Sequence, residues 1–254
     1  MLHLLRADFY RLIKCRWAIF LVCANISAVL VALVLCAASV RYGGNRSGSA
    51  VEAAVLLAAA PCSLNAVLFC PIVSCRSFAA ARIKISLGYT RRQVYFSNFL
   101  VSSLCLAGLY CISFALCCSL FPLFGFETGG AVSLLCLFPC GLALYLAYAA
   151  ACTGISFAAG KSSLAFALCA LFLIGEAYLN NFFIRLDAFM IEMGIGVPFS
   201  KLAMVFFTLL FPRGVLEMLV AGGSAYPLYI FLSCLFTALC AAVGNVSFRR
   251  KQLR

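Results

Sequence analysis

Residues 131–158 read AVSLLCLFPCGLALYLAYAAACTGISFA, a run of 28 residues without a single charged side chain. About 20 consecutive apolar residues are enough for a helix to cross the hydrocarbon core of a bilayer. Comparable apolar stretches lie at about 17–40, 51–73, 95–121, 163–183 and 226–246. The sequence therefore predicts an all-α integral membrane protein with six transmembrane helices, in which residues 1–254 form one transmembrane domain.

The composition supports lipid as the surrounding solvent. Of the 254 residues, 66% are hydrophobic and only 10% are charged. A water-soluble domain of this length cannot bury so much apolar surface. The first apolar stretch also exceeds the roughly 7–15 residues of a signal-peptide core, so we expect it to be a permanent span.

Basic residues are distributed unevenly between the two sides of the predicted spans. With both termini in the cytosol, the cytosolic segments hold 14 of the 19 lysines and arginines, as the positive-inside rule requires. These residues are split among short juxtamembrane segments, so anionic lipid headgroups explain the net charge of +12 better than nucleic acid does. We therefore expect a multi-pass protein of the cell membrane that contacts the lipid bilayer and no nucleic acid.

Cysteine is abundant, and its placement argues against disulfides. Of 16 cysteines, 14 fall inside the predicted spans, while Cys15 and Cys75 lie at span edges. Buried free thiols behave as small apolar groups. Cys105, Cys111 and Cys117 are six residues apart, which turns them away from one another on a helix, so we predict no thiolate metal site.

Residues 1–16 have the pattern of an amphipathic helix. At 100° per residue one face is apolar, with Leu2, Leu5, Phe9, Leu12 and Ile13, and the rest carries Arg6, Asp8, Arg11 and Lys14. Such a helix lies in the plane of the membrane. We predict that it rests on the inner leaflet before the chain turns into the first span.

The cytosolic segment between spans two and three reads SCRSFAAARIKISLGYTRRQV, residues 74–94. It is long enough for a short helix over about 76–87, which Gly88 would close in the left-handed conformation. Thr90 and Gln93 have the spacing of a capping box, so the third span is predicted to begin there.

Arg91 and Arg92 fall in the first turn of that span. Positive charges there oppose the helix dipole, at a cost of some tenths of a kcal/mol each. Two explanations remain open: contact with headgroup phosphates, and contact with an acidic partner surface.

The loop over residues 184–225 is the largest segment predicted outside the membrane. Within it, residues 202–211 read LAMVFFTLLF, an apolar run about half as long as a span. A re-entrant segment and an interfacial helix are both compatible with this pattern.

Residues for catalysis are scarce. The only histidine is His3, which excludes histidine-type serine proteases and zinc proteases with paired histidines. Residues 154–163, GISFAAGKSS, resemble a phosphate loop, but five residues separate Gly154 from Gly160 where that loop has four. We therefore expect no catalytic residue, no metal ligand and no ATP or other cofactor bound by this chain.

Two features inside the spans are candidates for a role. Glu176 is costly in hydrocarbon unless it faces protein, water or a partner, so it is either functional or hydrogen-bonded near the outer interface, beside Tyr178, Asn180 and Asn181. A stripe of small residues, which allows another helix to approach closely, consists of Ala143, Ala147, Ala151 and Gly154. The partner of the stripe belongs either to the same bundle or to a second subunit.

Two stretches carry a family resemblance. RIKISLGYTRRQVYFSNFLV, residues 82–101, leads from a short helix through a glycine and a basic pair into a span, and VGNVSFRRKQLR, residues 243–254, ends the chain with a glycine, a phenylalanine and basic residues. With the amphipathic helix and the six spans, this layout resembles the separate membrane subunits, or permeases, of bacterial ATP-binding-cassette type 2 exporters.

The resemblance implies a transport subunit, not an enzyme. A cytosolic coupling helix between spans two and three would dock into a separate ATPase, which uses ATP and Mg; the residues at or near this contact would be Arg82, Lys84, Gly88, Arg91 and Arg92. A second permease copy or a related permease would complete the pathway, and the cargo would be an antimicrobial peptide, a drug or a lipid-like molecule. The alternatives are an intramembrane enzyme built on a lone carboxylate such as Glu176, and a noncatalytic sensor or immunity scaffold.

Overall fold

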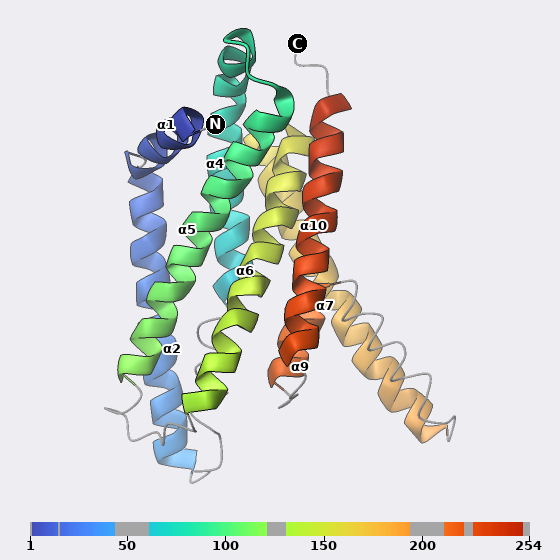
Figure 1. The fold of residues 1–254 in the computed structure, drawn as a ribbon. Coiled ribbons are helices and arrows are strands. Elements are labelled where there is room, and N and C mark those ends of the chain that lie inside the picture. Colours follow the sequence, from blue (N-terminus) through green and yellow to red (C-terminus); the bar gives the residue numbers. More distant parts are fainter. Residues whose placement is uncertain are drawn as a thin grey trace.

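The structure is a computed structural model that describes residues 2–14, 16–43, 61–120, 131–193, 211–220 and 226–250. These residues form a bundle of helices (Figure 1). The helices are α1 (Leu2–Ile13), α2 (Arg16–Gly43), α4 (Pro61–Ser86), α5 (Arg91–Leu120), α6 (Ala131–Ala159), α7 (Ser162–Glu192), α9 (Pro212–Val220) and α10 (Tyr226–Arg250).

Helix α6 lies at the centre of the bundle. It packs against α4, α5, α7, α9 and α10, and most extensively against α10. Its second half is rich in alanine, and most of the small side chains there are buried. Small residues allow helices to approach closely in a membrane, where the hydrophobic effect does not drive them together.

Four of the described helices are long and apolar enough to cross a bilayer. They comprise Arg91–Leu120, Cys136–Ala159, Ser162–Leu179 and Tyr226–Arg250. The described parts of α2 and α4 contain shorter apolar segments, Ile19–Val31 and Ser63–Ser74. The chain is therefore a helical, multi-pass membrane protein. The count of six spans stays a prediction.

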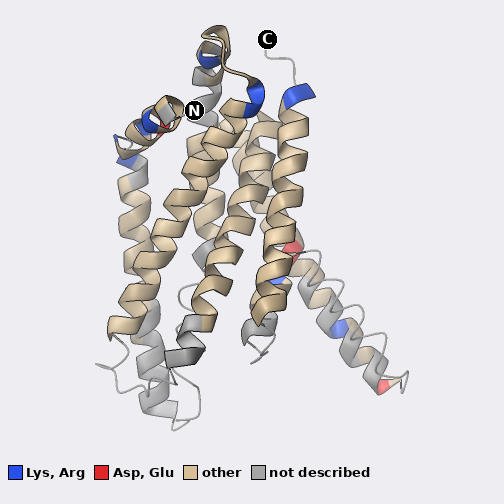
Figure 2. Cartoon of the chain, in the orientation of Figure 1, with Lys and Arg blue, Asp and Glu red and all other residues tan. Residues whose placement is uncertain are grey.

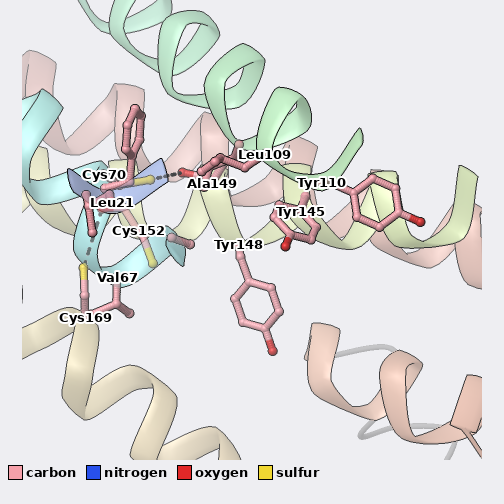
Figure 3. Close-up of a cluster of buried hydrophobic side chains, with 13 residues drawn as sticks. Leu21, Val67, Cys70, Leu109, Tyr110, Tyr145, Tyr148, Ala149, Cys152 and Cys169 are labelled. Atoms are coloured by element: carbon pink, nitrogen blue, oxygen red, sulfur yellow. Dashed lines mark hydrogen bonds between the residues drawn. The ribbon is translucent and has the colours of Figure 1, made fainter. Parts of the chain in front are cut away.

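The main core cluster joins α2, α4, α5, α6 and α7 (Figure 3). Within it the Cys70 thiol donates a weak hydrogen bond to the Ala149 carbonyl at 3.8 Å, and the Cys169 thiol donates to the Cys152 carbonyl at 3.7 Å. The cysteines of the described segments are free thiols. Five of them are buried, as the sequence predicted, whereas three are exposed; the buried ones are Cys70, Cys117, Cys140, Cys152 and Cys169, and the exposed ones are Cys23, Cys111 and Cys234.

Lysine and arginine gather at one end of the bundle, where α1, the α4–α5 turn and the end of α10 lie together (Figure 2). This arrangement follows from the direction of the helices, since α4 and α10 end there and α5 begins there. We call this end of the bundle the basic end.

Element boundaries differ from the prediction in two places. Residues 76–86 are helical as predicted, but they are the last turns of α4, which runs without a break from Pro61 through Pro71 to Ser86. The prediction of a separate short helix is therefore wrong. Helix α7 continues to Glu192, into the segment predicted as an outer loop, and α9 was not predicted. Of the apolar run 202–211, all but the last residue lies outside the described residues.

Candidate functional site

The turn between α4 and α5 has the geometry that its sequence predicts. Gly88 adopts a φ of 91°, in the left-handed region that favours glycine. The Gly88 N–H donates to the Ile85 carbonyl at 3.0 Å, and the Tyr89 N–H donates to the Lys84 carbonyl at 3.1 Å. These two bonds are the pattern that closes a helix with a left-handed glycine. The prediction that Gly88 ends the helix is confirmed.

A capping box starts the next helix. The Thr90 N–H donates to Gln93 Oε1 at 2.9 Å, and the Gln93 N–H donates to Thr90 Oγ1 at 3.3 Å. Two backbone donors that lack partners inside the helix are thereby satisfied. The predicted cap is confirmed, and the turn is fixed on both sides by local hydrogen bonds.

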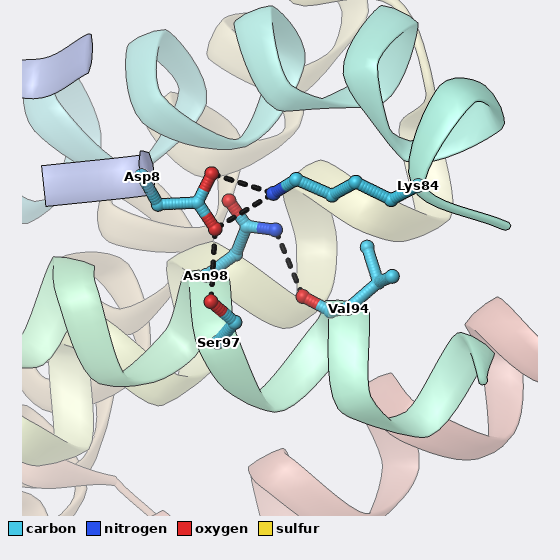
Figure 4. Close-up of polar contacts among 5 residues, drawn as sticks. All are labelled: Asp8, Lys84, Val94, Ser97 and Asn98. Atoms are coloured by element: carbon cyan, nitrogen blue, oxygen red, sulfur yellow. Dashed lines mark hydrogen bonds and ion pairs between the residues drawn. The ribbon is translucent and has the colours of Figure 1, made fainter. Parts of the chain in front are cut away.

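A buried ion pair holds this turn from the inside. Lys84 Nζ lies 2.5 Å from Asp8 Oδ1 and 2.7 Å from Asp8 Oδ2, and the two residues are only 7% and 6% exposed (Figure 4). The Ser97 hydroxyl donates to Asp8 Oδ2 at 2.8 Å. The cluster joins α1, α4 and α5.

This geometry corrects the role expected for Lys84. The sequence placed Lys84 among the basic residues that would meet a partner, yet its charge is neutralised by Asp8 inside the protein. The pairing partner is 76 residues away in the chain, so no local pattern indicated it. Lys84 stabilises the turn and offers no free charge at the surface.

The remaining predicted docking residues have different environments. The Arg91 guanidinium donates to the Arg249 carbonyl at 2.8 Å, at the end of α10. Basic groups are favourable there because the last carbonyls of a helix lack intrahelical donors. Arg92 is exposed and its guanidinium lies 5.7 Å from the centroid of the Phe96 ring. The side chain of Arg82 lies outside the described residues.

Sequence reasoning missed two apolar residues on the surface of this turn. Ile83 is 62% exposed and Leu87 is 71% exposed, and both lie close to the exposed Arg92 in sequence. Exposed apolar side chains rimmed by polar ones are typical of interaction sites. The spacing of four residues, which places both on one side of the last helical turn, was the available signal.

Halfway along α7, Glu176 anchors α9. It is 2% exposed, and its Oε1 accepts the Arg213 N–H at 2.7 Å while its Oε2 accepts the Tyr148 hydroxyl at 3.0 Å. Arg213 is the second residue of α9, so the carboxylate lies at the positive end of that helix. Glu176 is hydrogen-bonded, but not through the neighbours that the sequence suggested: Tyr178 is 74% exposed and Asn181 is also exposed.

The stripe of small residues is buried inside the chain. Ala143, Ala147 and Ala151 are at most 5% exposed. A Cβ placed on Gly154 would lie 3.5 Å from the Gly244 Cα of α10. The question that the sequence left open is therefore answered for Gly154, whose partner is a helix of the same bundle.

A groove lies beside this contact. One part, of about 480 Å³, lies between α6, α7 and α10 and includes Gly154 and Gly244. A neighbouring part of about 380 Å³ shares Ile155, Ala158 and Phe172 with the first, and Glu176 lines it. The lining is otherwise almost entirely apolar, so the groove suits apolar chains and not polar substrates.

Within the described ranges no group of three or more histidine, cysteine or acidic side chains is placed to hold a metal ion. Comparison with known protein families finds no matching family model. No curated protein is significantly similar to the chain.

Proposed function

We propose that this chain is the permease subunit of an ATP-binding-cassette type 2 exporter in the cell membrane. It crosses the bilayer six times with both termini in the cytosol, and it pairs with a second permease copy or a related permease. Separate ATPase subunits, which bind ATP and Mg, drive it. The cargo is an antimicrobial peptide, a drug or a lipid-like molecule.

The α4–α5 turn is the observation that carries this proposal. It lies at the basic end, where a cytosolic ATPase would meet the bundle. It is fixed by the Gly88 closure, the capping box and the Asp8–Lys84 pair, and it presents Ile83 and Leu87 to the outside. A rigid turn with an exposed apolar pair suits a contact that transmits force, because a flexible loop would absorb the movement.

The same geometry changes which residues are expected to contact the ATPase: apolar side chains become better candidates than basic ones. Lys84 forms an ion pair with Asp8, and Arg91 donates a hydrogen bond to the Arg249 carbonyl at the end of α10. Ile83 and Leu87 are therefore the stronger candidates for the ATPase contact, and Arg92 of the same turn is also exposed. Buried apolar side chains commonly dominate the binding energy of protein interfaces, while charges at the rim contribute less.

The groove and Glu176 fit transport better than chemistry. Both Glu176 oxygens accept hydrogen bonds that hold α9, so the carboxylate has a structural task. The apolar groove on α6 lies between helices that cross the membrane, as a path for a lipid-like cargo requires. These observations favour the transporter over the intramembrane enzyme.

The test is copurification of the full-length chain from its native cells in mild detergent. We expect an ATPase with a phosphate-loop motif to remain bound to the wild-type chain and to hydrolyse ATP in the purified complex. In the Ile83→Glu, Leu87→Glu variant we expect its recovery to fall at least about tenfold, because two buried apolar side chains contribute roughly 1.5–3 kcal/mol each.

A matched control separates this effect from a change of net charge. Lys161→Gln with Arg250→Gln also lowers the charge by two, and both residues are exposed, Lys161 between α6 and α7 and Arg250 at the end of α10. This control should retain the ATPase. Equal retention in both variants would contradict docking at the turn, and the absence of any ATPase from the wild-type complex would contradict the proposed function itself.

A further inference from the structure

Helix α1 has three distinct faces, of which only one contacts the protein. It lies across the basic end of the bundle instead of running along it (Figure 1). Leu4 and Asp8 are buried, Leu12 is partly buried, and α1 packs against α5 and α2. A spacing of four residues places these three side chains on one side of the helix.

The second face is an apolar ridge without a protein partner in the described part of the chain. Phe9 is 42% exposed and Ile13 is 58% exposed. At 100° per residue they follow directly on the buried side. The ridge therefore borders the buried side of α1 and is exposed at the surface.

The third face is basic. Arg6, Arg11 and Lys14 are exposed, and none of them forms an ion pair within the described residues. Lys14 Nζ lies 4.7 Å from the centroid of the exposed Tyr10 ring. The only acid of residues 1–16 is Asp8, which is turned inward and neutralised by Lys84. The outer surface of α1 consequently carries positive charge alone.

We propose that the outer surface of α1 is a binding surface for anionic phospholipid headgroups. It is defined by the basic residues Arg6, Arg11 and Lys14, the aromatic Tyr10, and the apolar ridge Phe9 and Ile13. An unbroken basic face next to an apolar ridge matches a membrane surface, with headgroup phosphates on the basic side and acyl chains on the ridge. Because Asp8 ties α1 to Lys84 and Ser97, lipid bound here contacts the same rigid unit as the α4–α5 turn.

The chain supplies its own reporter for a test. Trp17 is the only tryptophan and is the second residue of α2, four positions after the end of α1. The full-length protein is reconstituted in phosphatidylcholine vesicles. One series contains increasing fractions of brominated phosphatidylglycerol, and the other contains increasing fractions of brominated phosphatidylcholine. Quenching of Trp17 fluorescence is recorded in both. We expect the anionic lipid to quench at a several-fold lower mole fraction, since each basic residue near an anionic surface contributes roughly a fivefold preference.

Two variants decide the origin of the preference. Arg6→Gln, Arg11→Gln, Lys14→Gln should abolish it. The control Arg92→Gln, Lys161→Gln, Arg250→Gln has the same net charge and replaces exposed residues outside α1, so it should keep the preference. Raising the salt concentration to about 1 M should also weaken it, because the Debye length falls to about 3 Å. Equal quenching by the two brominated lipids in the wild-type protein would overturn the proposal and leave the basic face to a protein partner. A preference for the anionic lipid that survives the α1 substitutions would overturn the proposal as well.

Discussion

Replacing Asp8 by leucine removes the charge that neutralises Lys84, and replacing Lys84 by methionine removes the opposite one. Each single variant leaves one buried ion without a partner, since both residues are at most 7% exposed. The double variant, Asp8→Leu with Lys84→Met, leaves no ion at all. The three variants together therefore separate the cost of an unpaired charge from the cost of losing the pair.

The expected magnitudes follow from the geometry of the cluster. Removing one partner of a buried pair costs about 3–5 kcal/mol, whereas replacing both by apolar residues of similar volume is often neutral. Lys84 sits in the last turn of α4, from which its long side chain can bend toward solvent. We expect a loss of about 3 kcal/mol for each single variant and about 1 kcal/mol for the double variant, hence strong non-additivity.

The assay is unfolding in mixed micelles of mild detergent and SDS, followed by the fluorescence of Trp17. Arg6→Leu, on the exposed side of the same helix, is the control and should leave the free energy of unfolding unchanged within about 0.5 kcal/mol. Single variants within about 1 kcal/mol of the wild type would mean that the pair behaves like a solvated one and would refute this reasoning. Losses that simply add in the double variant would refute it as well.

Three further predictions use the same unfolding assay. Gly88→Ala should cost about 1 kcal/mol, because an alanine at a φ of 91° is strained even though open space surrounds the site, and Gly88→Asn should cost less. Gly244→Ala should cost about 1–3 kcal/mol, because its Cβ would meet backbone of α6 at 2.8 Å, while Gly175→Ala, with nothing within 4 Å, should not destabilise the protein. Glu176→Leu should lower the free energy of unfolding by about 3 kcal/mol, because it removes both acceptors. Glu176→Gln keeps one acceptor oxygen and should lower it by about half as much. Equal losses in the two variants would contradict this account of how α9 is held.

The features that the sequence predicted correctly are those set by local chemistry. The Gly88 closure depends on the backbone freedom of one residue, and the capping box depends on Thr90 and Gln93, three positions apart. The apolar stretches likewise identify helices by length and composition alone. Each of these signals lies within a few turns of chain.

The features that could not be predicted depend on distant segments. Asp8 reads as part of a polar helix face, and only the packing of α1 on α5 turns it toward Lys84. Arg91 reads as an unfavourable charge at a helix start until the end of α10 is placed beside it. The donor that reaches Glu176 from α9 is 37 residues away, so the sequence indicated a satisfied carboxylate but not its partner.

The hydrogen bond from Arg91 to the Arg249 carbonyl has a mechanical consequence. It fastens the first turn of α5 to the last turn of α10, two helices whose sequences are separated by most of the chain. This bond lies beside the buried contact of Tyr95, Phe157 and Phe248, which joins α5, α6 and α10 at the same end. The start of α5 and the end of α10 are thus held together by a polar contact as well as by packing.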